Sequence, residues 1–217
     1  QIAFGEDILT RVFYSKSDAP ALEEIRQATL ASFREVLEGL ERKSGYPVAS
    51  CGAMTVAGNT TMMHFLLGLD AFGVFASPYA PRAMRFDPYP ARDLGLPLDG
   101  YVYCYPCRAN YLGGDIVSGL VATNLTQESE ICVSLDIGTN GELVVGNQEF
   151  LLAGAGAAGP ALEGGSVRTG MRAENGAVDS VTTENGRLKA HVIGETEAKG
   201  ICGSGIVDLL AELYLNG

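Results

Sequence analysis

Apolar residues in the first half of the chain recur every three or four positions, which is the period of an α-helix with one buried face. This pattern predicts a helix over residues 6–15. It also predicts a longer helix that ends where Gly45 and Pro47 interrupt the repeat. The apolar stretch at 48–56 then predicts a short strand.

Two further helices are predicted in this half. Residues 62–67 are mostly apolar, with Asn59 or Thr60 as the N-cap, and helical spacing resumes from 115 to 125. Residues 77–106 contain six prolines and little periodicity. We expect this stretch to be irregular and well placed to cover a neighbouring surface.

The second half is patterned as strands joined by short turns. An apolar strand at 131–137 passes through small residues into a strand that ends near Val145, and another strand is predicted at 149–153. An Asn-Gly pair at 185–186 lies between two short strands, of which the second is at 188–193. These last segments predict an antiparallel meander.

The turn of the first hairpin in this half carries the most informative chemistry. Gly138 and Gly141 permit backbone angles closed to other residues and let main-chain N–H groups approach an anion, while the Thr139 hydroxyl adds a donor. Asp136 could hold a magnesium ion through water, because a hard cation on phosphate needs oxygen ligands. The alternative is an ordinary Asn140-Gly141 hairpin turn in which Asp136 is a capping residue.

A glycine-rich segment at 200–205 opens the last helix. Free N–H groups and the positive end of the dipole let a helix start bind an anion, so Gly203 and Ser204 are candidate phosphate contacts. Tight packing of the helix against a strand is the alternative interpretation. Five apolar residues are expected to face inward: Ile206, Val207, Leu210, Leu213 and Tyr214.

Other reactive groups have competing structural interpretations. Asp115, after two glycines, is a candidate second carboxylate of a catalytic cleft, or the N-cap of the helix that follows. His64 lies in an apolar helix and is expected to be a core residue. Cys104 and Cys107 form a C-x-x-C pair, but no second pair follows and neither histidine lies at ligand spacing, so a structural role is favoured over a redox or metal role.

Composition narrows the function classes. The 217 residues are 47% hydrophobic and 19% charged, as in an ordinary globular protein. A formal net charge of -11 argues against nonspecific binding of nucleic acid or an anionic membrane and fits a basic protein partner better. Membrane-span and signal-peptide patterns are lacking, so we expect a cytoplasmic protein. The five scattered cysteines predict reduced thiols.

Several motifs, taken together and in order, resemble one known family. They are residues 136–142, 157–165, 170–173 and 200–208 in the second half, and 1–7, 57–64 and 111–116 in the first. These motifs look like those of the ATPase domain of reductive activators of corrinoid proteins. The resemblance covers nearly the whole chain, which makes it far more specific than any single motif.

The resemblance implies an α/β fold of the acetate and sugar kinase, heat-shock chaperone and actin superfamily, with two ribonuclease H-like lobes that clasp a nucleotide. Residues 1–127 would be the C-terminal part of the first lobe with a proline-rich insertion, and 128–217 the N-terminal part of the second. The family's first phosphate hairpin and its adenosine motif are not in this sequence. We therefore expect the central segment of a longer protein, with both lobes incomplete and the segment alone inactive.

Members of this family use ATP to help return the cob(II)alamin of a partner corrinoid protein to the cob(I) state. The resemblance thus implies Mg-ATP, a corrinoid protein partner, and an iron-sulfur cluster in the parent protein outside this chain. In that scheme Asp136 would hold metal-bound water, and residues 138–141 would contact phosphate. One departure is Ala155-Gly156, where the family is expected to have a Ser-Thr pair.

Hypotheses from different classes stay open. The first is an ATPase whose parent protein closes around a corrinoid partner. The second is a docking and dimerisation scaffold for the corrinoid protein, with no chemistry inside the chain. A small-molecule kinase on the same fold is less favoured, because nothing identifies an acceptor pocket. The sequence leaves open which corrinoid system is served and whether a homodimer forms.

Overall fold

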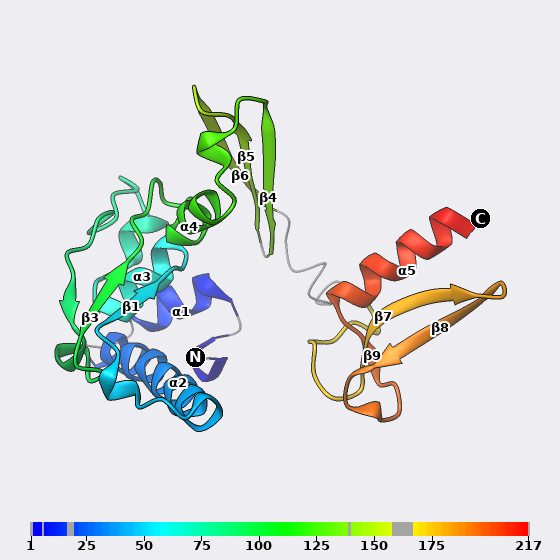
Figure 1. Ribbon diagram of the computed structural model, residues 1–217, viewed down its shortest axis with the longest axis horizontal. Coiled ribbons are helices and arrows are strands. Elements are labelled where there is room, and N and C mark those ends of the chain that lie inside the picture. Colours follow the sequence, from blue (N-terminus) through cyan, green and yellow to red (C-terminus); the bar gives the residue numbers. More distant parts are fainter. Residues whose placement is uncertain (1, 6, 17–19, 139, 158–166, 217) are drawn as a thin grey trace. The chain divides into compact units, whose positions relative to one another are not determined.

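The computed structural model describes residues 2–5, 7–16, 20–138, 140–157 and 167–216. The helices are α1 (Ile8–Tyr14), α2 (Ala21–Ser44), α3 (Thr60–Leu67), α4 (Gly114–Ala122) and α5 (Gly203–Asn216). The strands are β1 (Ala53–Val56), β2 (Tyr89–Pro90), β3 (Tyr101–Cys104), β4 (Cys132–Ile137), β5 (Asn140–Gly146), β6 (Leu151–Ala157), β7 (Ala177–Glu184), β8 (Arg187–Val192) and β9 (Gly200–Ile201) (Figure 1).

The chain divides into two compact units. The first unit comprises Gln1–Cys132 and Val145–Ala153, and the second comprises Val133–Val144 and Gly154–Gly217. No helix in the described part of the chain is long and apolar enough to cross a membrane.

Local capping chemistry sets the ends of the first helices. The Asp7 side chain accepts a hydrogen bond from a main-chain N–H of α1, and α2 ends at Gly45, whose φ of 73° suits a residue without a Cβ. Of the two caps considered for α3, the structure selects Asn59, and Gly68 ends the helix at a φ of 68°. The predicted helices of the first half are thus confirmed.

A three-stranded sheet in the order β1-β3-β2 forms the centre of the first unit. β3 runs parallel to β1 and antiparallel to β2. The expectation of an irregular 77–106 stretch is wrong at its end, because β3 is the middle strand, where Val102 and Cys104 are buried and alternate with exposed tyrosines. The predicted strand at 48–56 is shorter, since Val48–Ser50 is a 3-10 turn.

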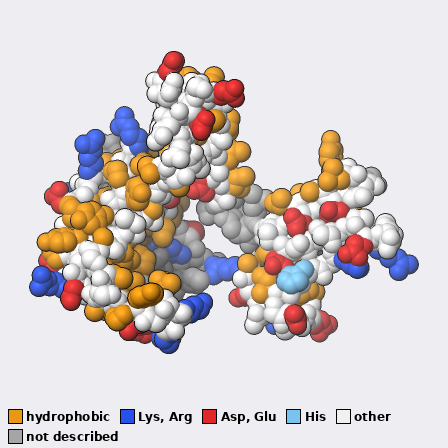
Figure 2. Space-filling view, viewed as in Figure 1, with side chains coloured by type: hydrophobic (Ala, Val, Ile, Leu, Met, Phe, Trp, Pro, Cys, Tyr) orange, Lys and Arg blue, Asp and Glu red, His pale blue; other side chains and the backbone are white. Residues whose placement is uncertain are grey.

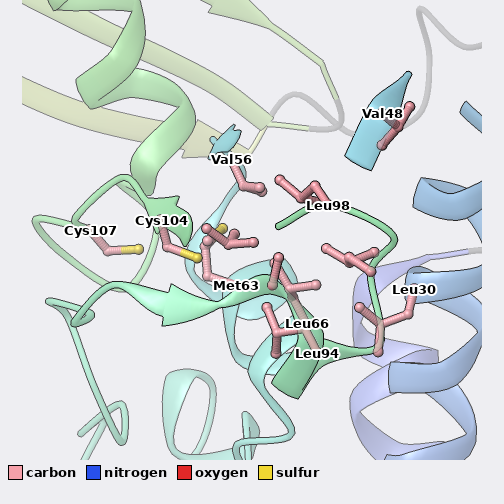
Figure 3. Packing of buried hydrophobic residues seen from close by; sticks show 12 residues of the cluster. Leu30, Val48, Val56, Met63, Leu66, Leu94, Leu98, Cys104 and Cys107 are labelled. Carbon is pink, nitrogen blue, oxygen red and sulfur yellow. The ribbon is translucent and has the colours of Figure 1, made fainter. Parts of the chain in front are cut away.

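The core of the first unit lies between this sheet, α2, α3 and the segment before β3 (Figure 3). Met63 and Leu66 from α3 meet Val56 from β1 and Val102 from β3. Leu94, also in this cluster, is only 4% exposed, so the proline-rich segment covers the core of its own unit. Burial of each such aliphatic side chain contributes roughly 1.5–3 kcal/mol.

The second unit contains the predicted meander. β7 pairs antiparallel with β8 across the Asn185-Gly186 turn, and β9 runs parallel to β7 on its other side. α5 packs against β7. A separate sheet has the order β4-β5-β6, which confirms the hairpin predicted after residue 131.

The expected inward face of α5 is wrong for four of its five residues. Val207, Leu210, Leu213 and Tyr214 are all more than half exposed. The face toward β7 instead carries the small Gly205 and the polar Asp208. The apolar stripe therefore belongs to the side of α5 that β7 does not cover.

Candidate functional site

The β4–β5 hairpin positions the strongest candidate side chain. Successive residues of a strand point to opposite faces, so Asp136 lies on the face opposite to Leu135 and Ile137. All three side chains are exposed. Asp136 therefore presents a carboxylate to solvent one residue before β4 ends, as the sequence predicts.

The turn that follows is closed by its own backbone. Gly138 N–H donates to the Asn140 carbonyl oxygen at 2.9 Å. Thr139, a predicted phosphate contact, lies outside the described residues. Neither Gly138 nor Gly141 has a φ in the left-handed region, so neither position uses the left-handed backbone angles that glycine permits.

The surroundings of Gly138 and Gly141 leave room for a side chain at both positions. Among the described residues, the nearest atom to a Cβ built at Gly138 would be the Asn140 carbonyl oxygen at 3.9 Å. A Cβ at Gly141 would lie 4.0 Å from the Gly156 carbonyl oxygen. Neither backbone strain nor internal packing therefore requires glycine here. Absence of side chains does leave the main chain open to close approach by a ligand.

The donor set fits a hydrated magnesium ion better than a dedicated metal cage. In the part of the chain that the structure describes, no three His, Cys, Asp or Glu side chains form a metal-binding group. Magnesium commonly takes one or two carboxylates together with substrate phosphates and retains several waters. The single exposed Asp136 carboxylate is compatible with that mode of binding.

Asp115 lies in the first turn of α4. The N-cap of this helix is Gly113, so the alternative interpretation of Asp115 as the N-cap is wrong. Asp115 Oδ1 accepts a hydrogen bond from Ile116 N–H at 2.9 Å. Gly113 is explained by packing, since a Cβ there would lie 2.4 Å from the Asn59 Cα. A catalytic role for Asp115 stays a prediction.

The C-x-x-C pair is buried beside the starts of α3 and α4. Burial raises the pKa of Cys104 to about 11, and the nearby Cys107 contributes to the rise. Burial also raises the pKa of Cys107, although hydrogen bonds with the Thr60 side chain and the Gly114 N–H offset part of the increase. Redox and metal chemistry need a thiolate, so this environment favours the structural role.

The start of α5 is held against β7. The Ser204 hydroxyl donates to the Asp179 carbonyl oxygen at 2.7 Å. A Cβ at Gly205 would lie 2.3 Å from the Val178 carbonyl oxygen. Tight packing therefore accounts for Gly205, and the Ser204 hydroxyl already has an acceptor within the protein. Gly203 is the first residue of the helix.

The predicted site residues thus fall on three separate elements. Asp136, Gly138, Asn140 and Gly141 share one hairpin, Gly203 and Ser204 begin α5, and Asp115 begins α4. Most of the small-residue motif at 157–165 lies outside the described residues.

Sequence reasoning missed the partners of α5. Asp179 lies where the register between β7 and β8 shifts, and its carboxylate Oδ1 is 2.6 Å from His191 Nδ1. Asp208 Oδ2 accepts a hydrogen bond from Val181 N–H at 3.2 Å. The irregular register at Asp179 could not be predicted, because a bulge has no reliable sequence signature. The acceptor of the Ser204 hydroxyl could not be predicted either, because it is a main-chain carbonyl oxygen and every residue has one.

Family models match both parts of the chain. A model of the RACo middle region matches residues 1–128, and a model of the C-terminal domain of RACo, the ASKHA domain, matches residues 130–217.

Individual proteins agree with these models. The corrinoid activation enzyme RamQ of Eubacterium limosum is 32% identical over 219 residues, which cover 100% of this chain and 37% of that protein. The [Co(II) methylated amine-specific corrinoid protein] reductase of Methanosarcina barkeri is 27% identical over 134 residues, covering 52% of this chain and 25% of that protein.

A solved structure is similar over the full chain. It is that of a reductive activator for corrinoid, iron-sulfur protein, with a TM-score of 0.84 and 40% identity. The match covers 100% of this chain and 35% of that one. The chain therefore spans only about a third of the length of the relatives that it matches over its whole length.

Proposed function

The chain belongs to the RACo family, and we propose that it serves in a reductive activator that uses Mg-ATP to help return the cob(II)alamin of a partner corrinoid protein to cob(I). Residues 130–217 belong to an ASKHA, actin-like, domain. We further propose that the parent protein forms two ribonuclease H-like lobes, the first including residues 1–127 and the second including residues 128–217.

The observation that carries this proposal is the open backbone of the β4–β5 turn. Neither Gly138 nor Gly141 has a φ in the left-handed region, and the described residues leave nearly empty space where a Cβ would be. The Gly138 N–H already donates to the Asn140 carbonyl oxygen, but a phosphate can approach the rest of the turn's main chain without a side chain in the way. Asp136 stands beside the turn with an exposed carboxylate. Together these features are compatible with a phosphate loop and its magnesium ligand.

Each candidate residue has a role in the proposal. Asp136 would hold the magnesium ion through water, while Gly138, Thr139, Asn140 and Gly141 would contact phosphate. Asp115 would be a second carboxylate of the cleft, and Gly203 would offer its main-chain N–H to the nucleotide. Bound Mg-ATP would supply a differential binding free energy that favours one of two conformations of the activator.

Electrons would enter the reaction from outside this chain. Iron-sulfur clusters are usually held by four cysteine thiolates. Cys104 and Cys107 are buried with raised pKa values, and the other cysteines are far apart in the sequence. An iron-sulfur domain elsewhere in the parent protein would therefore supply the electron.

Calorimetric titration of Mg-ATP into the parent protein tests the proposal. We expect Asp136→Ala to weaken binding at least tenfold, because the substitution removes the magnesium ligand. Glu149→Ala is the matched control, since Glu149 lies in the turn between β5 and β6, at the opposite end of β5 from residues 138–141. Unchanged affinity in Asp136→Ala, or no binding by the unaltered protein, would overturn the ATPase proposal.

A docking scaffold is the second candidate function. It is favoured by the exposed apolar face of β4, where Val133, Leu135 and Ile137 are 59%, 63% and 64% exposed. Such a face is typical of a contact surface for a protein partner or a second copy. Binding of the corrinoid protein with the same affinity in the presence and absence of Mg-ATP would favour this scaffold over the ATPase.

A further inference from the structure

The edge of β7 is covered by two different kinds of element. On β7, the partners of β9 are Ala177 and Val178. Immediately after β9, Cys202 N–H donates to the Val178 carbonyl oxygen at 3.0 Å. Beyond this point α5 replaces the strand as the neighbour of β7.

Two side chains of α5 continue the hydrogen bonding along that edge. Ser204 Oγ donates to the Asp179 carbonyl oxygen at 2.7 Å, and Asp208 Oδ2 accepts from Val181 N–H at 3.2 Å. One main-chain acceptor and one main-chain donor of β7 thereby gain partners. A main-chain group left unpaired in a packed interface would lower the stability, because it would lose its hydrogen bond to water without a replacement.

The distance between Ser204 and Asp208 along α5 matches the distance between their two main-chain partners along β7. Ser204 and Asp208 are four residues apart on one face of α5, a rise of about 6 Å. Asp179 and Val181 are two residues apart on β7, a rise of roughly 6.6 Å. A helix can therefore satisfy alternate main-chain groups of an extended strand through a serine and an aspartate one turn apart.

The close approach of α5 depends on the residue between them. A Cβ at Gly205 would lie 2.3 Å from the Val178 carbonyl oxygen and 2.9 Å from Ile201 Cγ1. The apolar residues Val207 and Leu210 lie on the exposed side of the helix. Val207 and Leu210 therefore do not hold the first turns of α5 on β7, whereas Ser204 and Asp208 hydrogen-bond directly to that strand.

We propose that Ser204 and Asp208 are positioning residues that clamp the first two turns of α5 onto β7 and so set the direction of the Gly203 main-chain N–H. This inference rests on the proposed function, in which Gly203 offers that N–H to the nucleotide. It gives Ser204 a positioning role in place of a phosphate contact, because its hydroxyl donates to the Asp179 carbonyl oxygen.

Variants of the full-length protein test the clamp. Ser204→Ala removes the donor, and Asp208→Leu removes the acceptor at similar size. We expect each to weaken Mg-ATP binding by about fivefold to tenfold and Asp208→Leu to accelerate amide exchange at Val181. Asp208→Asn keeps an acceptor oxygen and is expected to restore affinity to within about twofold. Glu212→Leu, one turn further along α5, is the matched control and should change neither quantity.

Several other outcomes of these measurements would overturn the proposed clamp, and each can be told apart from the others. Loss of affinity in Ser204→Ala with normal affinity and faster Val181 exchange in Asp208→Leu would show direct contact by Ser204 and overturn the clamp. Faster exchange with unchanged affinity in both variants would also overturn it, as would failure of Asp208→Asn to restore affinity. No Mg-ATP binding by the unaltered protein would overturn the proposed function and this role together. If Asp208→Leu does not fold, the smaller Asp208→Ala replaces it.

Discussion

His64 shows how one buried polar side chain can join two segments of the chain. Its Nδ1 is 2.6 Å from the Thr60 carbonyl oxygen, and its Nε2 accepts from Ala83 N–H at 3.4 Å. The neutral ring with its proton on Nδ1 satisfies both partners, because one nitrogen must donate and the other accept. The imidazole therefore ties α3 to the proline-rich segment.

This arrangement predicts a loss of stability in mild acid. Burial lowers the pKa of His64 below its usual 6.5, while the unfolded chain keeps the usual value. Below about pH 6.5 the unfolded state binds the extra proton first, so stability falls as the pH falls toward the lowered pKa. Urea unfolding between pH 5 and 8 should show this decline, and His64→Gln should show a flatter profile. An equally steep decline in His64→Gln would contradict the assignment.

The cysteines should differ sharply in reactivity. Cys51 is exposed, whereas Cys104 and Cys107 are buried and have raised pKa values. Only the thiolate reacts at an appreciable rate, so we expect fast labelling of Cys51 and at least hundredfold slower labelling of the buried pair at pH 8. Labelling with a disulfide reagent followed by peptide mapping measures both rates. Rapid labelling of Cys107 in the folded protein would contradict the structural role of the pair.

Residue-level prediction worked where the informative partner was close in the sequence. Asn59 could be proposed as a cap because its side chain accepts a hydrogen bond from a main-chain N–H only three residues later. Ser204 is a candidate phosphate contact because it lies at a helix start, but the sequence did not reveal that its hydroxyl donates to the carbonyl oxygen of Asp179, 25 residues earlier. A contact between distant main-chain and side-chain groups leaves no pattern in the sequence.

At the scale of elements, Gly205 should decide whether α5 packs against β7. Gly205→Ala places a methyl group 2.3 Å from the Val178 carbonyl oxygen, so the helix must move away from the strand. We expect a loss of about 2–4 kcal/mol in the unfolding free energy of this unit, in the range of overpacking and lost hydrogen bonds. Thermal or urea unfolding of the full-length protein measures the effect.

Gly119 in α4 provides the opposite case. A Cβ there would meet no atom of the described residues within 4 Å, and its φ lies outside the left-handed region. Alanine favours the helix interior over glycine by roughly 0.5–1 kcal/mol. Gly119→Ala should therefore stabilise the protein or leave it unchanged. Equal destabilisation by both substitutions would show that the space around Gly205 does not matter.

Elements that depend on nearby residues were predicted from the sequence, whereas elements that depend on distant residues were not. Helices with local caps, such as α2 and α3, were identified because their signals lie within a few residues. The strand β3 was not predicted, because it lies in a proline-rich segment with little periodicity. Its place between β1 and β2 also depends on pairing with residues that are distant in the sequence. The buried face of α5 was predicted wrongly, because apolar residues at helical spacing indicate a buried face but do not identify the element that would cover it.

For the molecule as a whole, apolar and charged surface are both abundant. Hydrophobic side chains lie exposed among charged ones on the visible face (Figure 2). In the described part of the second unit, Leu135 on β4 and Leu210 on α5 are 63% and 61% exposed. This chain spans 37% of RamQ and 35% of the solved activator. Exposed apolar faces of this kind are suited to contacts with other protein segments.

The charge is distributed unevenly along the chain. Residues 128–217 contain 13 of the 26 acidic residues but only 5 of the 15 basic ones. This part would therefore attract a basic surface and repel an acidic one before contact is made. If the proposed corrinoid partner docks here, its contact surface should be basic.

This charge predicts a salt-dependent encounter with the partner. Raising the salt from 50 to 300 mM shortens the range of electrostatic attraction, so we expect the association rate constant to fall at least fivefold while dissociation changes little. Stopped-flow mixing of the full-length protein with the corrinoid protein measures both rates. Replacing Glu195 and Glu197, which are exposed, by glutamine should lower the rate at low salt. An association rate that is independent of salt would place the contact on the apolar surface instead, because apolar burial does not weaken when charges are screened.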